Sequence, residues 1–129
     1  MFFTTPSQSA DTQQVLQAVI SAEHFDETLQ DATGAKPAHL TIAANGLFDV
    51  QQQLTWDGAR VTVIPAPVAE NKVSCLDVQT LHIGKKNARL YAYTANGKLI
   101  VKLNKTGDKW EVKHFYFRKK RKMVWDANF

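Results

Sequence analysis

The chain has 129 residues, the size of one domain, and this is enough to bury roughly two-thirds of its unfolded surface without a metal or disulfide. Its single cysteine, Cys75, excludes an intramolecular disulfide, and no apolar run is long enough to cross a bilayer. We therefore predict a single domain over residues 1–129. A lone cysteine favours the cytoplasm, and the polar start of the chain also suits a periplasmic protein whose leader has been removed.

The net charge of +4 is unevenly distributed. Residues 98–122 contain ten Lys or Arg and two acids, a local charge of +8, whereas the rest of the chain carries −4. Such an asymmetry suggests either an anionic partner or internal pairing with an acidic part of the fold.

The first predicted element is a helix over residues 11–33, preceded by an N-terminal arm over residues 1–10. Asp11 and Gln14 form a capping-box pattern at its start, and Gly34 ends it. Apolar residues recur at three- and four-residue steps and form its buried stripe: Val15, Val19, Ala22, Phe25 and Leu29.

The second half of this helix carries acidic residues, which the helix macrodipole disfavours at that end. We therefore expect them to pair with the basic C-terminal region. These acids are Glu23, Asp26, Glu27 and Asp31.

Residues 38–125 are predicted to form an antiparallel sheet of about six to seven strands, because tight-turn dipeptides such as Asp57-Gly58 and Asn96-Gly97 separate alternating segments. The fold class is therefore α+β, with the N-terminal helix packed in the concave face of a curved antiparallel sheet. The predicted strands span 39–44, 47–56, 59–66, 73–83, 88–94, 98–104 and 109–117, with 122–125 as a further short strand.

The last long strand, 109–117, differs from the others in its alternation. Strict alternation places Trp110, Val112, His114 and Tyr116 on one face and Glu111, Lys113, Phe115 and Phe117 on the other. Because its second half is then apolar on both faces, it needs two covers. We expect the helix to be one, and a homodimer partner on the outer face or the chain ends to be the other.

The segment "NGKLIVKLNKTGDKWEVKHFYFR", within residues 88–118, resembles the terminal hairpin of the nuclear-transport-factor-2-like superfamily. A cystatin-like arrangement of one helix on a sheet fits almost as well. Either resemblance implies a helix laid in a bent antiparallel sheet. The first also implies a pocket at the mouth of the cone, although it implies no particular chemistry. That superfamily usually has further short helices where residues 38–64 here are predicted to be strands.

Five consecutive cations follow the last long strand: Arg118, Lys119, Lys120, Arg121 and Lys122. With Tyr116 and Trp125 nearby, they could bind an anionic protein or a nucleic acid, by counterion release and stacking. The alternative interpretation is a solvated edge that prevents sheet-to-sheet aggregation. We predict that the strand leaves the core at Arg118.

Acid/base catalysis would need a titratable group inside the cone, and the candidates are Asp49, Asp77, His82 and His114, of which Asp77 and His114 are preferred. No second group is matched to either one. His24 and Glu27 offer only two ligands to a metal, so no metal or cofactor is predicted, and Cys75 is expected to be a buried structural residue.

Two functions remain open. We favour a non-catalytic binding domain with an accessory, immunity or secretion-related role, which engages a protein or other anionic partner through the open sheet and the basic C-terminal region. The alternatives are a small enzyme with a cone-shaped pocket for an apolar molecule and, less favoured, a nucleic-acid-binding module that uses the 118–122 run.

Overall fold

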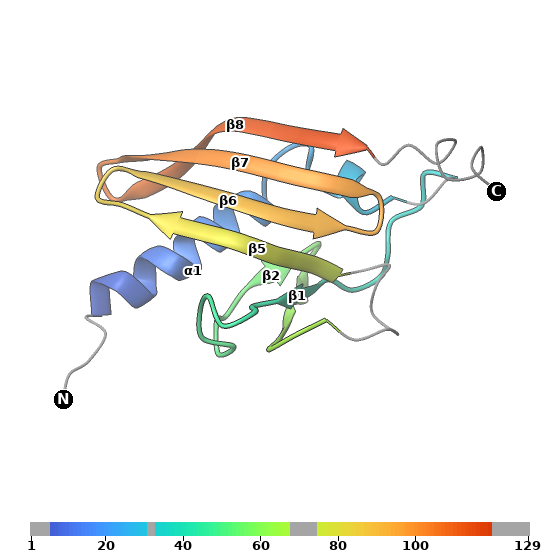
Figure 1. Ribbon diagram of the computed structural model, residues 1–129, viewed down its shortest axis with the longest axis horizontal. Coiled ribbons are helices and arrows are strands. Elements are labelled where there is room, and N and C mark those ends of the chain that lie inside the picture. The colour runs from blue at the N-terminus through green and yellow to red at the C-terminus, as the bar shows by residue number, and fades with distance from the viewer. Residues whose placement is uncertain (1–5, 31–32, 68–74, 120–129) are drawn as a thin grey trace.

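The computed structural model describes residues 6–30, 33–67 and 75–119. It confirms the α+β class, with a helix crossing behind the four long strands of the sheet (Figure 1). The elements are α1 (Pro6–Ile20), the 3-10 helix η1 (Phe25–Thr28), β1 (Thr41–Ala43), β2 (Thr55–Trp56), β3 (Ala59–Arg60), β4 (Thr62–Ile64), β5 (Cys75–Ile83), β6 (Asn87–Thr94), β7 (Gly97–Thr106) and β8 (Lys109–Lys119). The predicted strand at 122–125 lies outside the described residues.

Helix α1 is displaced relative to the prediction. It begins at Pro6, inside the predicted arm, as suits a residue favoured in the first helical turn, and it ends at Ile20. Asp11 therefore lies within the helix and does not cap it. Phe25 and Leu29 still reach the core, but from η1 and its C-cap, because packing against the sheet overrides the helical period.

The main sheet has the strand order β4-β1-β5-β6-β7-β8. Strands β5 to β8 are antiparallel neighbours, as predicted, but β1 runs parallel to both β4 and β5. The expectation that all neighbours would be antiparallel is therefore wrong for β1. The chain makes a long excursion after β1 and re-enters the sheet as β4 in the same direction, which a tight hairpin could not achieve.

The excursion contains the predicted hairpin at Asp57-Gly58. Both turn residues have positive φ, 55° and 78°, as a primed turn requires, and they join β2 to β3 in a separate two-stranded sheet. Only two residues on each side are strand, so the predicted strand over 47–56 is largely irregular.

A β-bulge interrupts the ladder between β7 and β8. Leu103 lies opposite Val112, and Lys102 lies opposite His114, so Lys113 is an extra residue on β8. One inserted residue reverses the alternation of every side chain that follows it.

Because of this bulge, Phe115 and Phe117 lie on the same face as Trp110 and Val112, and all four pack against the core. The predicted faces of the last strand are therefore wrong beyond Val112. Its apolar residues need one cover, not two. The strand therefore gives no reason to expect a second layer on the outer face, and a homodimer stays a prediction.

The core fills the space between α1, η1 and the covered face of the sheet. Asp11 ties the two layers together, since one of its carboxylate oxygens accepts hydrogen bonds from Trp110 Nε1 at 3.2 Å and Lys105 Nζ at 3.3 Å. The largest fully buried side chains include Phe25, Leu16, Leu29, Leu40, Ile42, Leu54, Leu76, Leu90, Leu99 and Leu103. No helix within the described ranges is long and apolar enough to cross a membrane.

Candidate functional site

The outer face of β5–β8, which is turned away from α1, presents a row of four side chains, two of them tyrosines. Cross-strand partners place Thr80, Tyr91, Ile100 and Tyr116 side by side on four successive strands, about 4.8 Å apart. Tyr116 is 57% exposed, and Tyr91 and Ile100 are partly exposed. We call these four residues the tyrosine row.

A basic row flanks the tyrosine row on each side, about 7 Å away along the strands. The first basic row contains Tyr93, Lys98 and Arg118, with Asp77 opposite Tyr93 at its β5 end, and the second contains His82, Arg89, Lys102 and His114. The Lys and Arg residues of the two rows are Lys98, Arg118, Arg89 and Lys102, and every residue of the two rows except Asp77 is exposed.

Two bulges produce this arrangement. The extra residue Lys113 turns His114, Tyr116 and Arg118 outwards, and a second shift at Gln79 on β5 directs Thr80 and His82 to the same face. Without the bulge in β8, strict alternation would turn Tyr116 towards the core.

Within the described residues, the Lys and Arg side chains of the two basic rows form no ion pairs. Lys98 lies opposite Arg118, and Arg89 lies opposite Lys102, so like charges meet directly across the ladder. Ion pairs found in the described part of the chain include none of these four side chains. Arg89 instead lies over the ring of Tyr91, with its guanidinium carbon 5.7 Å from the ring centroid, a cation–π contact.

Acidic residues are sparse on this face. Asp77 accepts a hydrogen bond from Asn45 Nδ2 at 2.6 Å, near the β1 side of the sheet. Glu111 lies opposite Asn104, one position beyond the second basic row. Neither acid lies opposite a Lys or Arg, so the central part of the outer face keeps a positive field.

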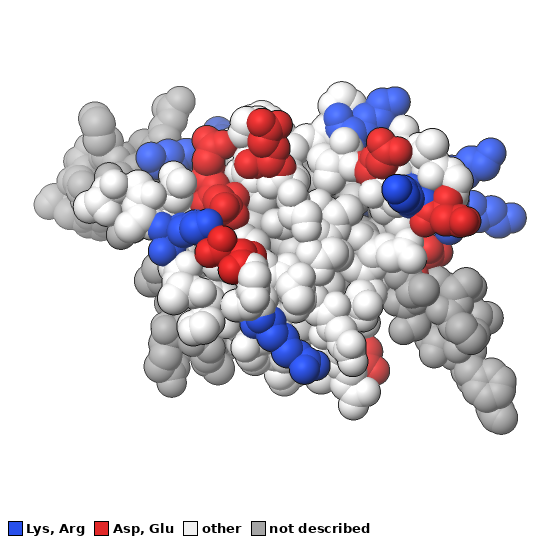
Figure 2. Space-filling model, turned by 180° about the vertical axis from the view of Figure 1, so that it is seen from behind, with Lys and Arg blue, Asp and Glu red and all other residues white. Residues whose placement is uncertain are grey.

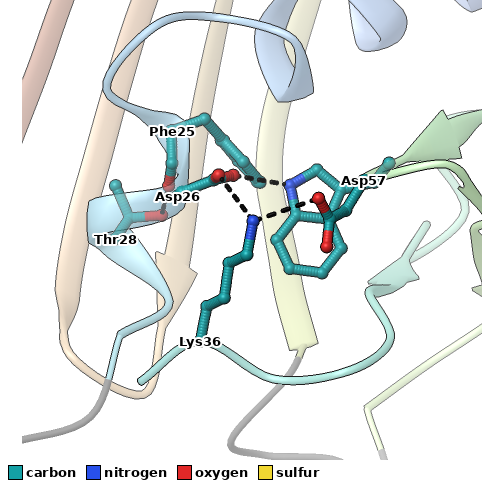
Figure 3. A network of polar contacts seen from close by, with 6 residues as sticks. Phe25, Asp26, Thr28, Lys36 and Asp57 are labelled. Carbon is teal, nitrogen blue, oxygen red and sulfur yellow. Dashed lines mark hydrogen bonds and ion pairs between the residues drawn. The ribbon is translucent and has the colours of Figure 1, made fainter. Parts of the chain in front are cut away.

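The opposite side of the molecule differs, because its acidic and basic side chains lie next to one another (Figure 2). Lys36 Nζ contacts Asp26 at 3.2 Å and Asp57 at 3.1 Å, and Asp26 also accepts a hydrogen bond from Trp56 Nε1 at 2.8 Å (Figure 3). The hydrogen bonds to Asp57 and Asp26 raise the pKa of Lys36. This network connects η1 to the β2–β3 turn and is structural.

The predicted pairing of the acidic segment with the C-terminal cations is not seen among the described residues. There, Asp26 pairs with Lys36, and Glu27 pairs with His24 at 2.7 Å. Asp31 and the cations Lys120, Arg121 and Lys122 lie outside the described residues, so their pairing stays a prediction. Within the described part, Lys105 pairs with Asp11 and joins the basic region to α1, which the sequence analysis missed.

Three of the predicted binding residues fall on the described end of β8. Tyr116 and Arg118 lie on the outer face, and Lys119 is exposed at the end of the strand. The others, Lys120, Arg121, Lys122 and Trp125, lie outside the described residues. Sequence reasoning missed the contribution of Tyr91, Arg89, Lys98 and Lys102. Alternation within a single strand shows only that each of these side chains points away from its buried neighbours, and the register between strands is needed to place all four on one surface.

The predicted acid/base residues do not converge. Asp77 and His114 both belong to the outer face, on β5 and β8, with β6 and β7 between them, a separation of about 14 Å or more. Phe25 and Leu29, which are 0% and 1% exposed, belong to the core cluster.

A shallow cleft of about 580 Å³ lies elsewhere, between α1, the loop after β1 and the end of β5. Both carboxylates that line it have structural partners: Asp11 holds Trp110 and Lys105, and Asp49 accepts a hydrogen bond from the backbone N–H of Gln51 at 2.8 Å. The lining residues are Asp11, Thr12, Leu47, Phe48, Asp49, Gln52, Leu81, Ile83, Gly84 and Lys85.

The remaining candidates have structural roles. Cys75 is buried, and burial together with the nearby charge of Asp77 raises the pKa of its thiol, which disfavours the nucleophilic thiolate. His24 and Glu27 bond to each other. Over residues 6–30, 33–67 and 75–119, no group of three or more His, Cys, Asp or Glu is placed to hold a metal.

Comparisons of the chain with protein-family models, with curated proteins and with solved structures find no match. The resemblance of residues 88–118 to the nuclear-transport-factor-2-like superfamily therefore stays a prediction.

Proposed function

We propose that this protein is a non-catalytic binding domain whose outer sheet face, together with the basic end of β8, engages an anionic partner. The observation that carries the proposal is the alignment of Arg89, Lys98, Lys102 and Arg118 on one face without ion-pair partners among the described residues. Like charges in direct cross-strand positions destabilise a sheet, and a bound anion would relieve that repulsion.

Protection of the sheet edge explains only part of this charge. In the main sheet, β8 is an edge strand, so Arg118 and Lys119 could serve to prevent aggregation. Arg89, Lys98 and Lys102 lie on the interior strands β6 and β7, where no edge needs protection. Their positions favour a binding role.

The test compares two double variants of equal charge change on immobilised heparin, a sulfated polyanion. Lys98→Glu/Lys102→Glu removes outer-face cations, whereas Arg60→Glu/Lys85→Glu removes exposed cations of β3 and of the β5–β6 turn, beside the cleft next to α1. We expect the first variant to elute at much lower salt than the wild-type protein and the second to elute close to it. Equal losses of heparin retention in both variants would mean that binding depends only on net charge, and this would contradict the proposal.

A further inference from the structure

We infer that the anionic partner is a single-stranded nucleic acid, whose bases stack on the tyrosine row and whose phosphates contact the basic rows. This inference rests on the proposed function and specifies its ligand.

The first argument is the exposure of the aromatic rings. Tyr93 and Tyr116 are 46% and 57% exposed. Their strands, β6 and β8, also have buried positions that hold apolar side chains, so these two rings are not exposed for lack of a core. Tyr91 and Tyr116 are two strands apart, about 10 Å, and Tyr93 lies about 7 Å from Tyr91 along β6. Unpaired bases have flat π-faces that stack on such rings, whatever the sequence.

The second argument is the position of the cations relative to the rings. Lys98 and Arg118 lie on one side of the tyrosine row, and Arg89 and Lys102 lie on the other. A strand whose bases lie on the rings carries its phosphates beside them, within reach of long cationic side chains. Arg89 also covers part of the Tyr91 ring, so its guanidinium plane extends the stacking surface.

Other anionic partners use less of this surface. An acidic peptide would satisfy the cations but would give the exposed tyrosine rings no flat partner. A nucleic-acid duplex keeps its bases stacked internally, and among the described residues no helix lies on the outer face of β5–β8 to enter a groove. A second copy of the chain, docked through the same face, would bring like charges together.

The test measures binding of fluorescein-labelled oligothymidylate and oligouridylate, each of about 12 nucleotides, to the full chain by fluorescence anisotropy. We expect Tyr116→Ala to weaken binding roughly ten-fold or more, because stacking on one ring is lost, and Tyr116→Phe to bind within about two-fold of the wild-type protein. Circular dichroism of both variants verifies that the fold is retained, as expected at an exposed position.

The salt dependence tests the cations separately. Four phosphate contacts predict a slope of log K against log salt of about −3, and Lys98→Gln/Lys102→Gln should reduce its magnitude to about half. The variant Arg60→Gln/Lys85→Gln serves as the matched control and should leave the slope unchanged.

Two further ligands separate failure of the inference from failure of the proposed function. The oligothymidylate annealed to its complement should bind more weakly than the single strand and should not respond to Tyr116→Ala. Polyglutamate that binds as tightly as the oligonucleotide, with the same dependence on Lys98 and Lys102, would overturn the inference and identify an acidic protein partner. If Lys98→Gln/Lys102→Gln leaves the binding of heparin, polyglutamate and oligonucleotide unchanged, both the inference and the proposed function are overturned.

Discussion

Lys98 on β7 and Arg118 on β8 lie directly opposite each other on the outer face. Cross-strand pairs in this position have their Cβ atoms about 5 Å apart, and like charges there destabilise the sheet by a few tenths of a kcal/mol to about 1 kcal/mol. The fold tolerates this repulsion together with that between Arg89 and Lys102. Stability and binding should therefore respond in opposite directions to changes at these positions.

The variant Lys98→Glu tests this separation. It converts a repulsive pair with Arg118 into an attractive one, so the free energy of unfolding should stay level or increase by up to about 1 kcal/mol, while affinity for polyanions falls. Urea denaturation gives the first quantity and retention on heparin gives the second. Lys85→Glu, at an exposed lysine of the β5–β6 turn beside the α1 cleft, is the control and should change neither substantially. A large loss of stability in Lys98→Glu would indicate a structural role for this lysine.

Asp11 should be important for stability, because it accepts hydrogen bonds from Trp110 and Lys105 across the junction of helix and sheet. Asp11→Ala leaves both donors without a partner, and we expect it to lower the free energy of unfolding by about 1–2 kcal/mol. Asp11→Asn keeps an oxygen for Trp110 Nε1 and should cost less. Equal losses in the two variants would show that the ion pair with Lys105, and not the bond to Trp110, carries the effect.

The Lys36 network should make stability depend on pH in the alkaline range. Its hydrogen bonds to Asp57 and Asp26 raise the pKa of Lys36 in the folded state above the unfolded value of about 10.4. The stabilisation is therefore fully present below about pH 10 and is lost as the pH rises through the folded-state pKa.

The measurement is the difference in urea midpoint between the wild-type protein and Lys36→Met from pH 8 to pH 11. This difference should shrink towards the alkaline end. Lys86→Met, at an exposed lysine of the β5–β6 turn, is the control and should give a small difference. A constant difference for Lys36→Met would mean that its charge contributes nothing to the network.

The bulge at Lys113 can be tested by deletion. Removing this residue restores strict alternation, which turns Phe115 and Phe117 towards solvent and Tyr116 towards the core. We expect a loss of about 3 kcal/mol or more, because two aromatic side chains leave the core. Lys113→Ala keeps the residue count and should stay within about 0.5 kcal/mol of the wild-type protein. A deletion variant of wild-type stability would contradict the register described for β8.

Local signals in the sequence predict the hairpins well, for physical reasons. Asp57-Gly58 marks a turn, Asn96-Gly97 marks another to within one residue, since the turn is Ala95-Asn96, and the alternation of Leu99, Val101 and Leu103 identifies the buried face of β7. These features depend on backbone preferences and on side-chain period within a few residues. The fold class could be predicted from them.

Features that depend on distant residues could not be predicted. The bulge at Lys113 leaves no mark in the composition of β8, and the parallel pairing of β1 with β4 and β5 depends on how the chain returns after a long excursion. The same limit applied to the outer face. Tyr91 and Tyr116 belong to one surface only because the register through Ile100 aligns them.

The contact between Asp11 and Trp110 joins residues 99 positions apart in the chain. On a ribosome that adds about 5–20 residues each second, α1 emerges roughly 5–20 s before the strand on which it packs. Strands β5 to β7 can pair in order as they appear, since each hairpin is local, but the apolar stripe of the helix is not fully covered until β8 is made. Nascent chains of this protein should therefore depend on chaperones that shield an early amphipathic segment until β8 arrives.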